Sequence, residues 1–145
     1  MNNPRVIIDA GPLVALIRTH DSFHEWASNC VQHLAGPFIT SESVISETCF
    51  LLHRDGIAVE KLFAFFRRGL IQIKFDLQAE WESVASLMER YARMPKGSMS
   101  LADATLVRLS EIDENAAVFT IDRHFRFYRK HGRRQIPLII PDAVR

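Results

Sequence analysis

The sequence of 145 residues has only two cysteines and no long apolar run. Cys30 and Cys49 fit neither a disulfide framework nor a zinc site, so a reducing compartment is the default expectation. No stretch approaches the roughly 18 apolar residues of a membrane span, and no early stretch resembles a signal peptide. We therefore expect a cytoplasmic protein that has no contact with a membrane.

Charge of one sign is not in excess either, because 18 Lys and Arg residues face 17 Asp and Glu residues, for a net charge of +1. Overall charge thus gives no argument for a nucleic-acid partner. The chain also lacks a glycine-rich phosphate loop, and Ser41, Ser43 and Ser46 have no evident histidine and acid partners for nucleophilic catalysis. These absences leave the acidic residues as the main chemical signal.

Four of the acids stand at or within apolar runs. Asp9 and Asp122 each close a short run, whereas Glu47 and Asp103 lie inside longer ones. Carboxylates avoid apolar surroundings unless their charge is compensated. Taken singly, Asp9 and Asp122 can be helix caps, Glu47 a solvated helix residue and Asp103 one half of an ion pair. A shared divalent cation explains all four placements, and oxygen-only ligation favours Mg²⁺ or Mn²⁺ over zinc.

Apolar spacing and turn residues predict short strands that alternate with helices. The predicted strands are 5–8, 38–40, 70–75, 117–121 and 137–140. The predicted helices are 12–17, 23–34, 41–53, 59–68, 77–93 and one that begins near 100 and carries Asp103. Strands this short without alternation are buried on both faces, and helices between them provide crossovers. We expect one α/β domain over residues 1–145, with a mostly parallel central sheet and helices on both sides.

The predicted sheet brings the acids toward one edge, because ligands bind at the carboxyl ends of parallel strands. Asp9 and Asp122 each follow a strand directly and are expected on that edge. Helical geometry places Glu47 at the border of a buried stripe, facing a cleft. Asp103 lies on a helix that is apolar nearly all round, which predicts that its side chain is largely buried.

A basic run follows Asp122, and no acid occurs between Asp122 and Asp142. Its cations are Arg123, Arg126, Arg129, Lys130, Arg133 and Arg134, with His124 and His131 among them. Phe125, Phe127 and Tyr128 interleave with these cations. A solvated helix with core aromatics explains the run as well as phosphate binding does, but its position beside the acids favours phosphate. The expected nucleic-acid contacts are Arg123, His124, Arg126, Arg129 and Lys130.

Four segments in order resemble the PIN-domain ribonucleases, in particular VapC-type toxins of bacterial and archaeal toxin–antitoxin pairs. The matching pieces are VIIDAGPLVAL at 6–16, the helix around Glu47, MSLADA at 99–104 and VFTIDRHF at 118–125. Each motif alone is loose, whereas all four in this order are fairly specific and extend over essentially the whole chain.

The resemblance implies a three-layer α/β/α sandwich and cleavage of RNA that depends on Mg²⁺ or Mn²⁺. The acids that carry over as metal-binding and catalytic residues are Asp9, Glu47, Asp103 and Asp122. Thr120 resembles the hydroxyl residue that orients the site, and His124 stands where many family members have a further acid. The resemblance also implies a homodimer and a cognate antitoxin.

Two other functions are compatible with the pattern. The chain can be a non-catalytic RNA-binding module with a vestigial site, although the complete acidic set argues against this. It can also be a Mg²⁺-dependent phosphoryl-transfer domain, which would need a lysine beside a nucleophilic aspartate. No lysine falls within the four motif segments. We predict a metal-dependent endoribonuclease in which Asp9 or Asp103 serves as general base.

Overall fold

Short parallel strands form the central sheet of the computed structural model, which describes residues 4–95 and 97–144. In chain order they are β1 (Val6–Ile8), β2 (Phe38–Thr40), β3 (Ile71–Ile73), β4 (Ala117–Phe119) and β7 (Leu138–Ile139). They lie across the sheet in the order β3-β2-β1-β4-β7, and every neighbouring pair is parallel. The chain adds β2 and β3 on one side of β1 and β4 and β7 on the other. A topological switch point therefore lies between β1 and β4.

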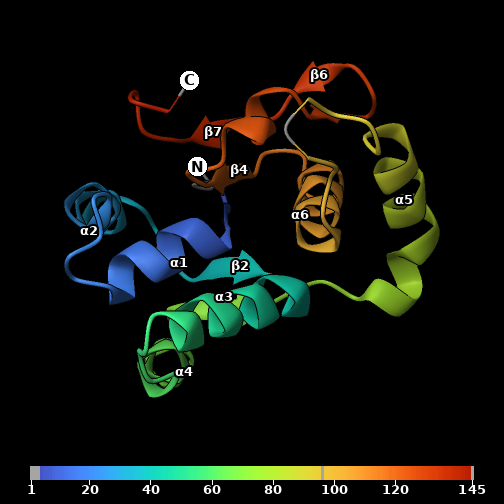
Figure 1. Cartoon of the computed structure of the whole chain (residues 1–145). Coiled ribbons are helices and arrows are strands. Elements are labelled where there is room, and N and C mark those ends of the chain that lie inside the picture. The colour runs from blue at the N-terminus through green and yellow to red at the C-terminus, as the bar shows by residue number, and fades with distance from the viewer. Residues whose placement is uncertain (1–3, 96, 145) are drawn as a thin grey trace.

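Helices pack on both sides of this sheet. They are α1 (Ala10–Ile17), α2 (His24–His33), α3 (Glu42–Arg54), α4 (Glu60–Arg67), α5 (Leu77–Arg90) and α6 (Leu101–Ile112). In Figure 1 the strands run through the middle of the molecule, with α2 at the left and α6 and α5 at the right. The predicted fold class, an α/β/α sandwich with a mostly parallel sheet, is confirmed.

The core explains why the strands read as unbroken apolar runs. All three residues of β1 are buried, and because neighbouring side chains point to opposite faces, both faces of this strand are covered. Phe119 of β4 contacts Trp26 of α2 edge to face, with ring centroids 5.3 Å apart, and Phe38 of β2 at 6.1 Å. Each such large side chain contributes about 1.5–3 kcal/mol through burial, which fixes the strands that carry the acids.

The first helix begins earlier than the sequence predicted. Asp9 is its N-cap, and the Asp9 carboxylate accepts a hydrogen bond from Ala10 N at 2.8 Å. Pro12 is therefore the third helical residue and not the first. Proline is tolerated there because backbone N–H groups of the first turn have no partner within the helix.

Several other boundaries differ, and one hairpin was not predicted. The third, fourth and last strands are shorter than expected, and α5 ends at Arg90 instead of 93. Arg129–Lys130 and Arg134–Gln135 form the antiparallel strands β5 and β6 in a second, two-stranded sheet. Two-residue strands rich in cations carry no apolar alternation, so the sequence has no signal for them.

Both cysteines are free thiols, as the sequence predicted. Cys30 lies on α2 and Cys49 on α3, and each is partly buried. Within residues 4–95 and 97–144, no helix combines the length and the apolar content needed to cross a membrane.

Candidate active site

Two of the predicted acids lie at adjacent strand ends, at the switch point of the sheet. Asp9 follows β1, and its backbone N–H donates to Phe119 O of β4 at 3.0 Å. The Thr120 hydroxyl donates to Asp9 Oδ2 at 2.7 Å and accepts from Asp122 N at 3.0 Å. Thr120 is fully buried and Asp9 is 6% exposed, so this link lies inside the protein. One hydroxyl thus connects two of the acids.

A close approach between α1 and the end of β4 keeps these strand ends together. An added Cβ at Gly11 would lie only 2.5 Å from Ile121 Cγ1, which is closer than two carbon atoms can pack. Glycine therefore lets the first turn of α1 lie directly against the residue between Thr120 and Asp122. Gly11, two residues after Asp9, therefore leaves room for the Ile121 side chain beside the acid.

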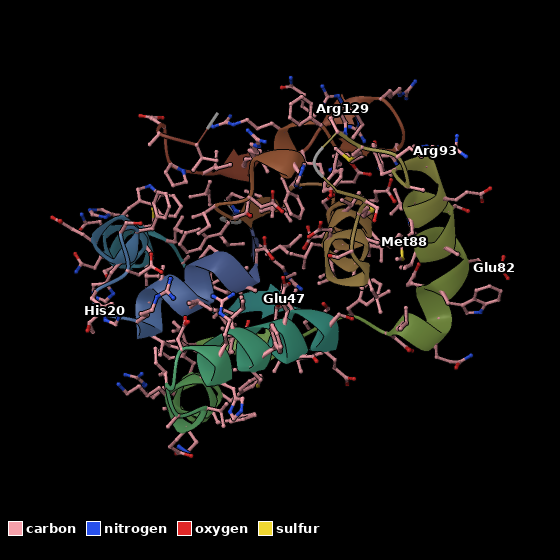
Figure 2. All side chains as sticks on the ribbon, viewed as in Figure 1. His20, Glu47, Glu82, Met88, Arg93 and Arg129 are labelled. Atoms are coloured by element: carbon pink, nitrogen blue, oxygen red, sulfur yellow. The ribbon has the colours of Figure 1, made fainter. Side chains whose placement is uncertain are left out.

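Glu47, labelled in Figure 2, lies on α3. This helix contacts both α1 and α6. Ser41 caps this helix by accepting a hydrogen bond from Val44 N at 3.3 Å. The Ser41 hydroxyl also lies 2.7 Å from the Thr105 hydroxyl of α6, and both residues are buried. The predicted buried stripe of α3 is confirmed at Val44 and Thr48, and Glu47 itself is exposed at its edge. The hydroxyl contact sets α3 against the helix that carries Asp103.

Asp103 occupies the third position of α6. Its backbone N–H is capped by the Ser100 hydroxyl at 3.0 Å, and its Oδ2 accepts a hydrogen bond from the Tyr128 hydroxyl at 2.9 Å. The side chain is only partly exposed and burial raises its pKa, which agrees with the expectation that it would be largely buried. Asp103 lies in the first turn of α6, between the buried residues Ala102 and Ala104.

Burial and the charges of neighbouring acids raise the pKa values of Asp9, Glu47 and Asp103. Burial raises the pKa of Asp9 from 3.8 to about 7, with a further contribution from the charge of Asp103. Burial and the charges of Asp103 and Asp122 raise the pKa of Glu47. The pKa of Asp103 is raised by burial and by Asp122, against the opposing effect of the Tyr128 hydrogen bond. These mutual effects indicate that the four acids occupy one electrostatic site.

Positive charge from the protein does not balance this site. Over residues 4–95 and 97–144, no lysine or arginine forms an ion pair with any of the four acids, and only His124 contacts one, with Nδ1 3.0 Å from Asp122 Oδ1. The predicted alternative that Asp103 pairs with an arginine was therefore wrong for the described residues. Arg108 contacts Glu80 and Glu111 instead.

The donor set fits a hard divalent cation. Asp103 Oδ1, Asp122 Oδ2 and both Glu47 carboxylate oxygens accept no hydrogen bond from residues that the structure describes. Carboxylate oxygens are the ligands that Mg²⁺ and Mn²⁺ prefer. In the present rotamers no three Asp, Glu, His or Cys side chains of the described chain converge closely enough to hold an ion. This spacing is expected for like charges that repel one another, and a cation would remove the repulsion.

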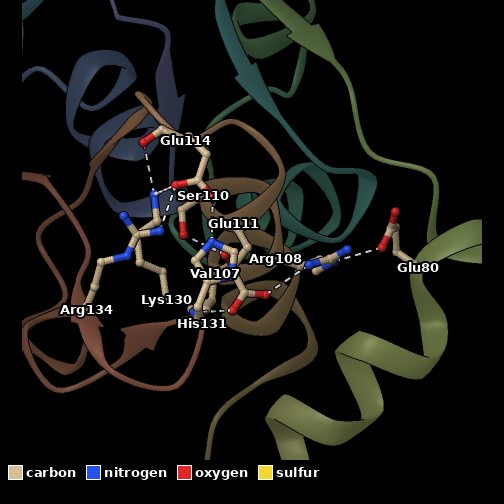
Figure 3. A network of polar contacts seen from close by, with 9 residues as sticks. All are labelled: Glu80, Val107, Arg108, Ser110, Glu111, Glu114, Lys130, His131 and Arg134. Atoms are coloured by element: carbon tan, nitrogen blue, oxygen red, sulfur yellow. Dashed lines mark hydrogen bonds and ion pairs between the residues drawn. The ribbon is translucent and has the colours of Figure 1, made fainter.

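The basic run divides into two parts. Lys130 is only 3% exposed, and its Nζ donates to Glu114 O at 3.1 Å. Figure 3 shows Lys130 among the residues of this polar network. His131 and Arg134 contact the Glu114 carboxylate as well, at 2.6 and 2.9 Å. These three residues anchor the β5–β6 hairpin to the end of α6. The expectation that Lys130 contacts nucleic acid was wrong, because its ammonium group is buried against Glu114.

The remaining arginines of the run lie close to Asp122 in sequence and form no ion pair with any acid of the described chain. Arg123 and Arg126 belong to the short 3₁₀ helix η1 (Arg123–Arg126), which Asp122 caps by accepting a hydrogen bond from His124 N at 2.9 Å. Arg126 donates to Val144 O and Arg129 to Arg126 O, so both guanidinium groups contact only backbone carbonyls. Their positive charge is not neutralised.

Tyr128 is the site residue that sequence reasoning missed. It was expected only as one of several aromatic side chains within the basic run. The structure places its hydroxyl on Asp103, although the two residues are 25 positions apart. No local pattern encodes such a contact, so only the position of Tyr128 six residues after Asp122 could have drawn attention to it.

The fold and the acid cluster define an α/β/α protein with a candidate metal site at the switch point of its sheet. The family model for the PIN domain matches residues 6–130, and the chain belongs to the PIN domain family. Among solved structures, the fold is similar to that of VapC20 from Mycobacterium tuberculosis, a toxin that cleaves the sarcin–ricin loop. The TM-score is 0.66 at 19% identity over 81% of this chain and 89% of that chain. No curated protein sequence matches this chain.

Proposed function

We propose that the protein is a metal-dependent endoribonuclease, and that it is the toxin of a toxin–antitoxin pair. The observation that carries the proposal is the group of acids at the switch point. They have no lysine or arginine partner in the described chain, and burial together with neighbouring acidic charges raises the pKa values of Asp9, Glu47 and Asp103. Membership of the PIN family and the similarity to an RNA-cleaving toxin support the same function.

The acids Asp9, Glu47, Asp103 and Asp122 would hold one or two ions of Mg²⁺ or Mn²⁺. A bound ion would stabilise the negative charge that develops on a phosphodiester during hydrolysis and make a water molecule more acidic. Thr120 fixes the Asp9 carboxylate through its hydrogen bond to Oδ2. Asp9, whose pKa is raised to about 7, and Asp103, whose pKa is also raised, are the candidates for the group that accepts a proton.

Arg123, His124, Arg126 and Arg129 would contact the RNA backbone. They follow Asp122 directly, and the three arginines form no ion pair with acids of the described chain. Guanidinium groups bind phosphate in a bidentate manner, which suits an exposed site such as Arg126. Lys130 is left out of this set because it is buried against Glu114.

The proposal includes a homodimer and a cognate antitoxin in the cytoplasm. Two large apolar side chains of α3 and α4, Phe50 and Phe63, are 66% and 41% exposed. If these side chains belong to one contiguous apolar patch, that patch would suit contact with another protein chain. Free cysteines agree with a reducing compartment.

Cleavage of RNA should require a divalent ion. We expect the purified protein to cut total cellular RNA or stem-loop oligonucleotides in Mg²⁺ or Mn²⁺, and to lose this activity by about 100-fold or more in EDTA, because the acids alone repel phosphate. Activity should return when Mn²⁺ is added in excess of the chelator. Asp122→Asn provides the inactive reference for contaminating nucleases.

Two outcomes would contradict this function. RNA that binds to the protein but stays intact in Mg²⁺ and in Mn²⁺ would indicate a non-catalytic binding module. Covalent labelling of the protein by a phosphoryl donor such as acetyl phosphate, without RNA cleavage, would indicate a phosphoryl-transfer domain instead.

A further inference from the structure

Tyr128 carries a buried hydroxyl group into the acid cluster. The residue is 1% exposed, and its hydroxyl donates to Asp103 Oδ2 at 2.9 Å. Its ring packs edge to face against Tyr91 and Phe125, with centroids 5.0 and 5.1 Å away, and stacks on His124 at 6.5 Å. This aromatic packing holds the ring in one orientation, so the hydroxyl has a fixed direction.

The contact repeats the arrangement that Thr120 makes with Asp9. In each case a buried hydroxyl donates to Oδ2 of an acid, at 2.7 Å for Thr120 and 2.9 Å for Tyr128. For Asp103 the second oxygen, Oδ1, accepts no hydrogen bond from the described chain. A carboxylate held through one oxygen presents the other oxygen to a ligand in a defined position.

The orientation of the Asp103 carboxylate depends more on a single side-chain hydroxyl than that of Asp9 does. Asp9 is buried and its Oδ1 accepts from Ala10 N, so the backbone and Thr120 fix both of its oxygens. Asp103 lies in the first turn of α6 and is partly exposed, and the Tyr128 hydrogen bond lowers the pKa of its carboxyl more than its weaker contacts with Ser100 do. Without the Tyr128 hydroxyl, only the weaker contacts with Ser100 in the same helix turn would orient the Asp103 carboxylate.

We propose that Tyr128 is a positioning residue of the metal site, whose hydroxyl holds Asp103 so that Oδ1 faces the bound ion. This inference rests on the proposed function, since it presumes that Asp103 is a ligand. Partners behind the ligands of a metal typically change metal affinity by 10–100-fold when they are removed. Tyr128 belongs to the segment that begins at Asp122. Within this segment His124 N donates to Asp122, and the Tyr128 hydroxyl links the segment to Asp103 on α6.

Mn²⁺ binding by Tyr128→Phe tests the proposal directly. The substitution keeps the ring packing and removes only the hydroxyl, so the fold should remain intact. Isothermal titration with Mn²⁺ should show a dissociation constant about tenfold higher than for the unmodified protein. Cleavage should show a matching rise in the Mn²⁺ concentration that gives half-maximal rate, with a much smaller change at saturating Mn²⁺.

Tyr91→Phe is the matched control. Tyr91 lies in the same aromatic cluster, and its hydroxyl accepts a hydrogen bond from Arg129 N at 3.0 Å without contacting an acid. Its loss should leave Mn²⁺ affinity unchanged. An equal loss of affinity in both variants, or an unchanged affinity in Tyr128→Phe, would overturn the positioning role. Failure of the unmodified protein to bind Mn²⁺ would overturn the proposed function together with it.

A second measurement does not depend on the folding of Tyr128→Phe. The chain has only two tyrosines, so Tyr128 is the sole tyrosine of the Tyr91→Phe variant. Adding Mg²⁺ to that variant should produce a tyrosine difference spectrum in the ultraviolet. The Tyr128 hydroxyl donates to the Asp103 carboxylate, and the electronic environment of Tyr128 should change when this carboxylate binds the ion. A titration without such a difference would contradict the proposal.

Discussion

Replacing Asp9 with asparagine is expected to abolish RNA cleavage and to stabilise the metal-free protein at the same time. Cleavage should fall by about 100-fold or more, because an amide cannot supply the charged ligand that a divalent ion requires. Stability should rise at pH 8 by about 2–4 kcal/mol, because the buried Asp9 carboxylate no longer has to ionise beside Asp103 and Glu47. The negative charge of Asp9 thus lowers the stability of the fold, although the proposed metal site requires it.

The pH dependence follows from the direction of the pKa shift. The pKa of folded Asp9 is about 7, against 3.8 without burial, so the folded protein binds this proton more tightly than the unfolded chain does. Its stabilising contribution is fully present below about pH 4 and is lost as the pH rises to about 7. The pKa values of Glu47 and Asp103 are also raised, so their contributions act in the same direction.

Urea denaturation in EDTA at pH 5 and pH 8 measures this effect. The free energy of unfolding of the unmodified protein should fall between the two pH values, and Asp9→Asn should reduce that fall. Asp76→Asn is the control, because Asp76 also caps a helix, accepting from Ala79 N, but is exposed and far from the acids in sequence. If Asp9→Asn were less stable than the unmodified protein at pH 8, the carboxylate would not be electrostatically strained.

Glu47→Gln is expected to have the second largest effect. We expect cleavage to fall by about 100-fold with a change in stability of no more than about 0.5 kcal/mol, because Glu47 is exposed and forms no hydrogen bond within the described chain. The change also removes the repulsion that Glu47 exerts on Asp9. Cleavage rates at saturating Mg²⁺ measure the loss of activity, and thermal unfolding in EDTA measures the change in stability.

Glu42→Gln on the same helix serves as the comparison. Glu42 lies in the first turn of α3, is exposed, and contributes only about 0.3–1 kcal/mol through the helix dipole. Its replacement should leave cleavage unchanged. A variant pair with the opposite pattern, in which Glu42→Gln is inactive and Glu47→Gln is active, would assign the ligand role to Glu42.

Local patterns predicted the backbone positions of the acids well. Asp9 and Asp122 follow buried strands, and parallel pairing brings such strand ends to one edge of the sheet without any further information. The 3.6-residue period of α3 placed Glu47 at the border of its buried stripe. Strand and helix order were therefore readable because they depend on short-range periodicity.

The contacts that join distant segments could not be predicted in this way. The Tyr128 hydroxyl meets Asp103 across 25 residues, and Lys130 is drawn away from the surface by Glu114. Both depend on how η1 and the β5–β6 hairpin fold back onto α6. A cation run looks the same in sequence whether its members bind phosphate or anchor a hairpin, and only the position of Glu114 separates the two cases.

Diffraction from crystals soaked in Mn²⁺ tests the central claim most directly. The account predicts anomalous density between the strand ends of β1 and β4 and the first turn of α6, with Asp9, Asp103 or Asp122 oxygens as ligands and Glu47 moved toward the ion. One peak or two would decide how many ions bind beside His124. Anomalous density that appears only elsewhere on the protein, or is absent at the acids under saturating Mn²⁺, would contradict the account.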